Sequence, residues 1–467
     1  TMGATAEVAK SAGGHKVIER LSIFKLALLA LPWIGVQSIW ATEFGVVTPV
    51  LENYGLDPAL ASLIWIFGPL TGFFTAPAVG AFSDRSTNKY GRRRPFLLGG
   101  LLSTFLASAL FAFSYKMGSA RAAVGLIAFI CLDITINIIQ TPLRAFCSDM
   151  VPESQQSVVQ LLAALFQGLG GILGTGLMRA LWTGNDPSEL PKLFFTVMAI
   201  NIFFICLTCF TVHETPLTQA DLDARANAHD KGVLGTFVDV FASIPSMDKR
   251  IALICAIEFV SWAALFSWWP TASTWFARNV YNGCQEADAG CTPDRVQLYK
   301  DGTAIYNESG MFANLTQTLF SLALALSLQY GILKRMKVPY SLCLAVGAVF
   351  LILAKLGPQS HGFGYMVAIL MAVPIAAINS FPFALVGKVH AAKDAAEANV
   401  GKDFGVLNVS ICLPQLIITF VISAMRKSLG DEGLPWALLI AGAMFAVGAV
   451  LALFIREDFE ENKDNKA

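Results

Sequence analysis

Charged residues are scarce in this chain: they make up 14% of its 467 residues, whereas hydrophobic residues make up 55%. Soluble domains usually carry about 25% charged residues, and the mean hydropathy here is +0.59. The polar residues lie between apolar runs of about 20 residues, the length of a helix that crosses a bilayer. The 33 basic and 33 acidic residues balance, which gives no reason to expect a nucleic-acid partner. The composition therefore predicts an all-α membrane protein that contacts the lipid bilayer.

The chain also lacks the short motifs of several enzyme classes. It has neither a Walker loop nor a Rossmann glycine run, which argues against ATP-driven transport. The five histidines lie in predicted loops or at predicted span ends, and no His, Asp and Ser arrangement suggests hydrolysis. The nine cysteines do not have the paired spacing of a zinc site. We therefore expect no enzyme activity, no metal and no cofactor, with a proton gradient as the energy source.

Twelve apolar runs are predicted to span the membrane, with centres near Val36, Thr71, Thr104, Leu132, Gly168, Ile202, Ala264, Leu322, Val346, Pro374, Leu413 and Met444. The N-terminus begins polar and the first apolar run leads directly into a span, so we expect no cleavable signal peptide. Most lysines and arginines fall in loops on the side of the N-terminus. By the positive-inside rule this places both termini in the cytoplasm.

A polar loop divides the spans six and six. We predict an N-terminal half at residues 1–213, a cytoplasmic linker at 214–250, and a C-terminal half with a short cytoplasmic tail at 251–467. Within the linker, residues 218–231 are expected to be soluble and partly helical, and residues 237–245 to lie along the membrane surface. Two six-helix halves with the substrate between them near the midplane are the general plan of the major facilitator fold.

The fourth predicted span carries an acid inside an apolar run. Four of its polar residues follow at spacings of four, three and four, which is one face of an α-helix: Asp133, Asn137, Gln140 and Arg144. A rise of about 1.5 Å per residue separates Asp133 from Arg144 by about 16 Å. A charge inside a membrane costs at least a few kcal/mol, so it usually faces a wet cavity and marks a substrate or proton path. The alternative is a structural carboxylate, for example one paired with Arg144.

The loop after the second predicted span combines glycines, an acid and clustered arginines. Glycine permits close helix approach, and an acid at a helix end can pair with basic residues of a short loop. The loop resembles the gating loop of the major facilitator superfamily, with a longer insertion between its two parts, and its candidate gating residues are Gly80, Asp84, Arg85, Gly91, Arg92, Arg93 and Arg94. The alternative is a basic loop that only holds this side in the cytoplasm.

Short blocks in both halves carry a more specific resemblance. In the first half they are residues 61–69, 83–85 with 91–96, and 132–149. In the second half they are residues 261–262, 275–283, 381–385 and 405–415. These blocks resemble the sucrose–proton symporter family of plants and its fungal and animal relatives. The first predicted span has Glu43 where plant members usually have glutamine, which favours the fungal and animal branch.

The resemblance implies a proton-coupled disaccharide carrier. In that family the acid of the fourth span is expected to bind a sugar hydroxyl and take the coupling proton, and here it is Asp133. The matching Arg144 is expected to interact with that carboxylate or with the inner gate. Glu43 is a second intramembrane acid, either a proton relay or a structural partner. Glu258, near the start of the seventh span, is expected to be a helix-end or interface residue.

A sugar site needs amide side chains that hydrogen-bond to adjacent sugar hydroxyls, and aromatic rings that pack against the apolar face of the sugar ring. Besides Asp133, the candidates are Gln37, Trp40, Asn137, Gln160, Gln167, Trp262, Asn379, Asn408 and Gln415. Most single polar residues in a membrane bundle only join helices, so about a third of these are expected to contact ligand. Four other tryptophans are expected to pack or to lie at the membrane interface: Trp33, Trp65, Trp268 and Trp269.

Two cysteines differ from the others because they fall in the predicted outer loop between the seventh and eighth spans. Cys284 and Cys291 are therefore expected to form a disulfide, with two free thiols as the alternative. The sequon at Asn307 lies on the same side, but close to the eighth span.

Together these features predict a monomeric, alternating-access carrier that imports sucrose or a related glycoside with protons, most simply across the plasma membrane. The alternatives are a carrier of the same fold for a monosaccharide such as glucose or galactose, a vesicular exporter, or a sugar receptor that does not transport.

Overall fold

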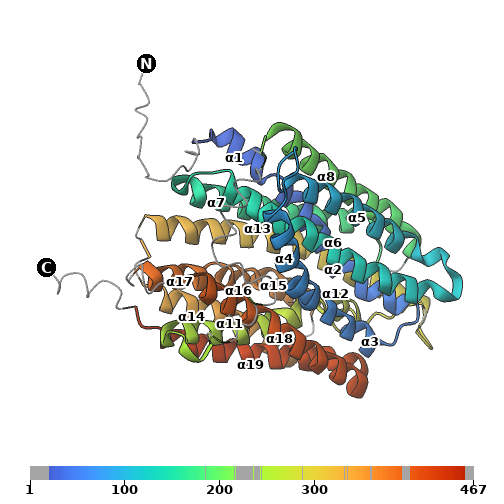
Figure 1. The fold of residues 1–467 in the computed structure, drawn as a ribbon. Helices are drawn as coiled ribbons and strands as arrows, with labels where there is room; N and C mark the ends of the chain where they lie inside the picture. Colours follow the sequence, from blue (N-terminus) through green and yellow to red (C-terminus); the bar gives the residue numbers. More distant parts are fainter. Residues whose placement is uncertain are drawn as a thin grey trace, which may run out of the picture.

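The computed structural model describes residues 20–184, 186–214, 216, 235, 242, 244–286, 288–330, 332–333, 335–357, 360–391 and 400–457. Over these residues the regular secondary structure is helical, without a β-strand, as the composition predicts. Figure 1 shows the helices lying side by side in one elongated bundle. The predicted soluble stretch at 218–231, and most of the predicted surface segment at 237–245, lie outside the described residues.

The helices of residues 20–214, here called the first half, are α1 (Ile23–Ala30), α2 (Pro32–Asn53), α3 (Pro58–Leu63), α4 (Phe67–Asp84), α5 (Arg94–Phe113), α6 (Arg121–Asp149), α7 (Glu153–Leu181) and α8 (Leu190–Thr211), with short 3₁₀ turns η1 (Ile64–Ile66), η2 (Ser114–Lys116), η3 (Gly118–Ala120) and η4 (Pro187–Glu189). Helix starts follow the local sequence. Asp57 caps α3 by accepting from the Ala59 amide at 2.9 Å, and Pro58 takes the first helical position, where no amide hydrogen is required.

The helices of residues 244–457, the second half, are α11 (Lys249–Trp268), α12 (Ala272–Trp275), α13 (Pro293–Gln329), α14 (Lys337–Leu356), α15 (His361–Leu370), α16 (Ala372–Ile378), α17 (Phe381–Ala391), α18 (Val400–Leu429) and α19 (Gly433–Leu453), with short turns η5 (Ile244–Ser246), η6 (Phe276–Val280, a π-helical turn) and η7 (Gly430–Glu432).

Ten helical segments among the described residues are long and apolar enough to cross a membrane. One of them, Val406–Leu453, contains two separate helices, α18 and α19. The predicted span near Leu322 lies in α13, which is not among the ten. The chain is thus an integral, multi-pass membrane protein, and the number of twelve spans stays a prediction.

Buried side chains form two clusters. One consists mainly of first-half residues and the other of second-half residues. Two sets of helices join the halves: α7 packs against α13, and α18 packs against α3 and α4. The α7–α13 contact depends on glycine, because a Cβ on Gly171 would lie 2.2 Å from the Asn314 side chain. Gly168 likewise lies directly opposite Thr318, so side chains larger than hydrogen do not fit at these two positions.

The bundle has two ends that carry different loops. We call the end with Glu52, Arg278 and the loop of residues 282–292 the disulfide end. We call the end with Arg92, Arg93 and Asp149 the arginine end. In Figure 1, α3 marks the disulfide end and α17 the arginine end.

Candidate functional site

Asp133 lies inside the bundle, on the face of α6 that meets α4. Its side chain is 1% exposed, and neither carboxylate oxygen has a hydrogen-bond partner among the described residues. The opposing face of α4 is formed by glycine: a Cβ on Gly68 would lie 3.5 Å from Asp133 Oδ2. Thr71 is the hydrogen-bonding side chain nearest to this carboxylate in effect, and in the structure its hydroxyl donates to the Gly68 carbonyl at 3.0 Å. Both carboxylate oxygens can therefore accept a ligand hydroxyl or a proton.

Glu43 on α2 is a second carboxylate of the same kind. It is fully buried, neither of its oxygens has a hydrogen-bond partner among the described residues, and its charge interacts with that of Asp133. Two like charges that interact inside a bundle repel each other, and a proton bound to either one removes the repulsion. Two buried carboxylates without hydrogen-bond donors are the kind of groups that a proton-binding site requires.

Asn137 continues the Asp133 face of α6, as the helical spacing predicts. Asn137 is 7% exposed, and its Nδ2 donates to the Asp133 carbonyl at 2.9 Å. A Cβ on Gly72 would lie 3.7 Å from Asn137 Oδ1, so Gly68 and Gly72 face Asp133 and Asn137 in register. Gly68 and Gly72 form a G-x-x-x-G pattern, the sequence signal that would have identified this contact.

Arg144 lies at the far end of the same face. Its side chain is exposed, and the guanidinium carbon lies 5.5 Å from the ring centroid of Trp33, a cation–π contact. Trp33 is buried, as its predicted packing role requires. No ion pair of Arg144 with Asp133 occurs among the described residues, so the predicted interaction of these two groups stays a prediction.

Four half-buried aromatic rings cross from the first half to the second. The centroid of Phe44 lies 5.9 Å from that of Trp40 and 5.6 Å from that of Trp269, and Trp269 lies 5.8 Å from Trp262. We call Trp40, Phe44, Trp269 and Trp262 the aromatic bridge. Phe44 also stacks at 4.8 Å on the buried Trp65. Trp40 and Trp262 are predicted sugar contacts, Trp269 was predicted to pack or to lie at the membrane interface, and Phe44 was not among the candidates.

Polar side chains hold both ends of the aromatic bridge. Trp40 Nε1 donates to Gln140 Oε1 at 2.9 Å, and Trp262 Nε1 donates to Glu258 Oε2 at 2.9 Å. The other Glu258 oxygen accepts from the Tyr340 hydroxyl at 3.1 Å. Glu258 is fully buried nine residues after the start of α11, so its predicted place at the helix end is wrong. Unlike Asp133, it is fully partnered.

The other predicted sugar contacts lie on three helices, α2, α7 and α18, and in the turn between α16 and α17. Gln37 and Gln167 are half-buried, and Gln160, Asn379 and Asn408 are exposed. Gln415 is 8% exposed and donates to the Ile411 carbonyl within α18 at 2.9 Å. Asn379 likewise donates to the Ile375 carbonyl at 2.8 Å. A direct role of these six residues stays a prediction.

The predicted gating loop is bound tightly within the first half. The Arg93 amide donates to Glu214 Oε2 at 2.8 Å and its Nε to Asp149 Oδ2 at 2.9 Å, and Arg92 also pairs with Asp149. Gly91 has φ +107°, and a Cβ there would lie 2.4 Å from the Glu214 carboxylate, so both backbone angle and space require glycine. Burial raises the pKa of Glu214, opposed by the Arg93 amide.

The remaining gating candidates are placed as follows. Gly80 lies on α4, and a Cβ at this position would lie 3.8 Å from the Thr141 side chain on α6. This agrees with the predicted close helix approach. Arg94 lies 3.4 Å from the His213 ring nitrogen, and Arg85 is exposed. The side chain of Asp84 lies outside the described residues. Gating itself stays a prediction.

The predicted disulfide is confirmed: Cys284 and Cys291 are bonded. The sequon residue Asn307 is fully buried within α13, so an oligosaccharide cannot be attached there in this conformation. Cys206 and Cys209 have C-x-x-C spacing on α8, so the expectation that the cysteines lack paired spacing is wrong, and both thiols are free.

Solved membrane transporters share the fold. The chain is similar to a POT family transporter in complex with 5-aminolevulinic acid, with a TM-score of 0.66 and 11% identity over 94% of this chain and 97% of that one. It is similar to a D-xylose-proton symporter, with a TM-score of 0.59 and 15% identity over 94% and 99% of the two chains. These identities show the fold alone.

Sequence relatives extend over nearly the whole chain. Sucrose transport protein SUT5 of Oryza sativa subsp. indica is 27% identical, covering 90% of this chain and 85% of the relative. Sucrose transport protein SUC3 of Arabidopsis thaliana is 25% identical, covering 94% and 89%. A sequence profile of the family described as "MFS/sugar transport protein" matches residues 47–289, more than half of the chain. The chain belongs to the MFS/sugar transport protein family, and it is a transporter rather than an enzyme.

Proposed function

We propose that this protein carries sucrose or a related glycoside together with protons, by alternating exposure of a site between its two halves. The observation that supports this most directly is the pair of buried, unpartnered carboxylates, Asp133 and Glu43. Ionised groups without donors are costly in a membrane interior. Such a pair persists where loading and release of a proton are part of function.

In this mechanism the protonated Asp133 donates to a sugar hydroxyl, or the ionised form accepts from one. Asn137 adjoins it on the same helix face, and the aromatic bridge offers ring faces to the apolar side of a sugar. Glu43, whose charge interacts with that of Asp133, is the second carboxylate that can take the proton. Sugar and proton thus occupy one site, which allows their movements to be linked.

The energy supply is adequate. One proton moving through 100 mV and one pH unit provides about 3.7 kcal/mol. That free energy sustains an accumulation of a few hundredfold, because each factor of ten costs about 1.4 kcal/mol. Coupling to the single Asp133–Glu43 pair is therefore sufficient.

Sucrose is the proposed substrate because the relatives named above are sucrose transport proteins. These relatives are plant proteins, so they do not support the predicted fungal and animal branch. A plasma-membrane location, cytoplasmic termini and a monomeric state are likewise proposals, and they put the disulfide end outside.

The test is uptake of radiolabelled sucrose by proteoliposomes with an imposed acid-outside gradient. We expect accumulation above the external concentration that an uncoupler abolishes. Unlabelled glucose and galactose serve as competitors. Uptake of a monosaccharide in place of sucrose would reassign the substrate, and sugar binding without flux would indicate a receptor. Sucrose flux that is indifferent to the gradient would contradict proton coupling.

A further inference from the structure

Charged side chains reach across the two halves at the disulfide end. Glu52, in the last turn of α2, accepts from two arginines of the second half: Arg278 Nη2 lies 3.2 Å from its Oε2 and Arg426 Nη1 lies 2.5 Å from its Oε1. The three side chains are 2%, 5% and 1% exposed, respectively. Arg426 Nη1 also donates to the Pro58 carbonyl at 3.0 Å and to Ser62 Oγ at 3.1 Å. One buried carboxylate thus connects α2 with both η6 and α18.

Two uncharged hydrogen bonds make the same crossing. Ser423 Oγ donates to the Ala59 carbonyl at 2.8 Å, and Gln285 Nε2 donates to the Pro49 carbonyl at 3.0 Å. The two acceptors are the carbonyl oxygens of Pro49 and Ala59, which lie on either side of Glu52 in the sequence. The α2–α3 corner of the first half is therefore bound to the second half by charged and neutral contacts together, and this end is closed in the structure.

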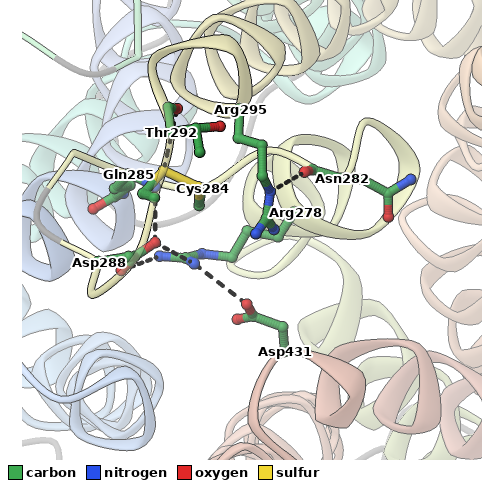
Figure 2. The surroundings of a disulfide bond; sticks show 9 residues. Arg278, Asn282, Cys284, Gln285, Asp288, Thr292, Arg295 and Asp431 are labelled. Atoms are coloured by element: carbon green, nitrogen blue, oxygen red, sulfur yellow. Dashed lines mark hydrogen bonds and ion pairs between the residues drawn. A yellow bond between two sulfur atoms is a disulfide. The ribbon is translucent and has the colours of Figure 1, made fainter.

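The arginines have further partners that do not cross between halves. Arg278 Nη1 lies 2.8 Å from Asp288 Oδ2 and 3.3 Å from Asp431 Oδ2, both in the second half (Figure 2). Arg426 Nη2 lies 3.9 Å from Asp431 Oδ1. If the halves separate here, Arg278 stays paired with Asp288 and Asp431, and Arg426 stays near Asp431. Glu52 alone loses its charged partners and becomes exposed to water. The contact can therefore open without leaving a buried unpaired cation, which is the costly outcome for an ion pair.

The disulfide holds one of these partners in place. Asp288 lies in the loop closed by Cys284 and Cys291, and its Oδ2 also accepts from the Gln285 amide at 2.8 Å. Figure 2 shows Asp288 and Asp431 approaching Arg278 from separate segments. A hollow of about 340 Å³, lined in part by Arg278, Asp288 and Asp431, lies against this cluster. Solvent that enters the hollow reaches the ion pairs when they open.

We infer that Glu52, with Arg278 and Arg426, is the gate that closes the transport path at the disulfide end. It exchanges between this bonded state and one in which Glu52 is released while both arginines remain bound to the second-half acids. The inference rests on the proposed function only in that a transported solute must pass this end. Glu52 on α2 is thus a gating residue at the disulfide end, in addition to the gating candidates of the α4–α5 loop at the arginine end.

The test is the accessibility of a site below the gate. Ile422 lies one turn before Arg426, is 2% exposed and packs in the cluster of first-half side chains. An Ile422→Cys reporter, with the free cysteines replaced by alanine, is labelled with a membrane-impermeant maleimide. We expect Glu52→Gln to raise the labelling rate by about tenfold or more, a shift of conformational population. Glu432→Gln is the matched control, because it removes an exposed ion pair with Lys355 inside the second half at the same end.

A cross-link provides a second, independent arm. Ala59→Cys with Ser423→Cys joins the two segments whose Oγ and carbonyl oxygen are 2.8 Å apart. Oxidation is expected to abolish flux and each single variant to retain it. Equal labelling of Glu52→Gln and Glu432→Gln, or undiminished flux after complete cross-linking, would overturn the gate. Increased labelling in a protein that moves no sucrose would support the gate and refute the proposed substrate.

Discussion

Gly68 and Asp133 face each other between α4 and α6, with 3.5 Å between the position of a Cβ on the glycine and Oδ2 of the acid. The backbone of α4 thus forms one wall beside the carboxylate. A hydrogen at Gly68 leaves that oxygen free for a proton or a hydroxyl, whereas any long side chain would occupy the same space.

Gly68→Leu is therefore expected to reduce the rate of sucrose uptake by about tenfold or more, equivalent to at least 1.4 kcal/mol. The added atoms extend from the Cβ toward the Asp133 carboxylate. The measurement is initial uptake in proteoliposomes at matched protein content. Gly99→Leu is the control, because a Cβ at Gly99 meets no atom within 4 Å. Equal effects of the two substitutions would contradict a site at this wall.

The aromatic bridge predicts different results for two substitutions of Trp40. Trp40→Phe keeps a ring but loses the hydrogen bond to Gln140, and a typical net hydrogen bond is about 1 kcal/mol, so KM should rise by about fivefold. Trp40→Ala removes the ring face and should raise KM further. Trp436→Ala is the control, since that side chain is 41% exposed. An unchanged KM in Trp40→Ala would exclude the ring from the sugar site.

The α4–α5 loop depends on Asp149, which binds both Arg92 and Arg93. Asp149→Asn should destabilise the loop by about 1–3 kcal/mol, because two guanidinium groups lose a charged acceptor. Limited proteolysis between α4 and α5 is the measurement, and faster cleavage is expected. Arg179→Gln is the control, because its pair with Glu308 is half-exposed on both sides. Unchanged cleavage in Asp149→Asn would show that Glu214 is enough to hold the loop.

The disulfide closes a short loop, with seven residues of sequence separation between its cysteines. Chain entropy predicts a loss of about 2–3 kcal/mol when such a bond is removed. Replacing both Cys284 and Cys291 with serine should lower the midpoint of thermal unfolding in detergent, and reductant should then have no further effect. A midpoint equal to that of the wild type would show that the contacts of Asp288 hold the loop without the bond.

Local features were predictable from the sequence because they depend on neighbouring residues. Helical spacing identified the shared face of Asp133 and Asn137, and the position of Cys284 and Cys291 in one outer loop indicated their bond. The basic loop at Gly91 was recognised as a unit, although its binding to Glu214 was not.

Contacts between distant segments were not predictable in the same way. Glu52 and Arg426 are 374 residues apart, and no local pattern indicates which arginine reaches a given acid. Glu258 was assigned to a helix end from its distance to the predicted boundary, whereas its depth depends on Trp262 and Tyr340 packing around it. Sequence composition indicated a span near Leu322, but it did not show that α13 packs against α7, which depends on glycines at 168 and 171 facing Thr318 and Asn314.

The role of Asp133 as the coupling residue is tested most directly by comparing the wild type with Asp133→Asn in proteoliposomes, with sucrose and proton movements recorded together. Asp186→Asn, which changes an exposed acid that caps the turn before α8, is the control. We expect the wild type and Asp186→Asn to move protons with sucrose and to accumulate it against its gradient. Asp133→Asn should do neither, because an amide cannot bind and release the proton. Uphill accumulation of sucrose with proton movement in Asp133→Asn would contradict that role.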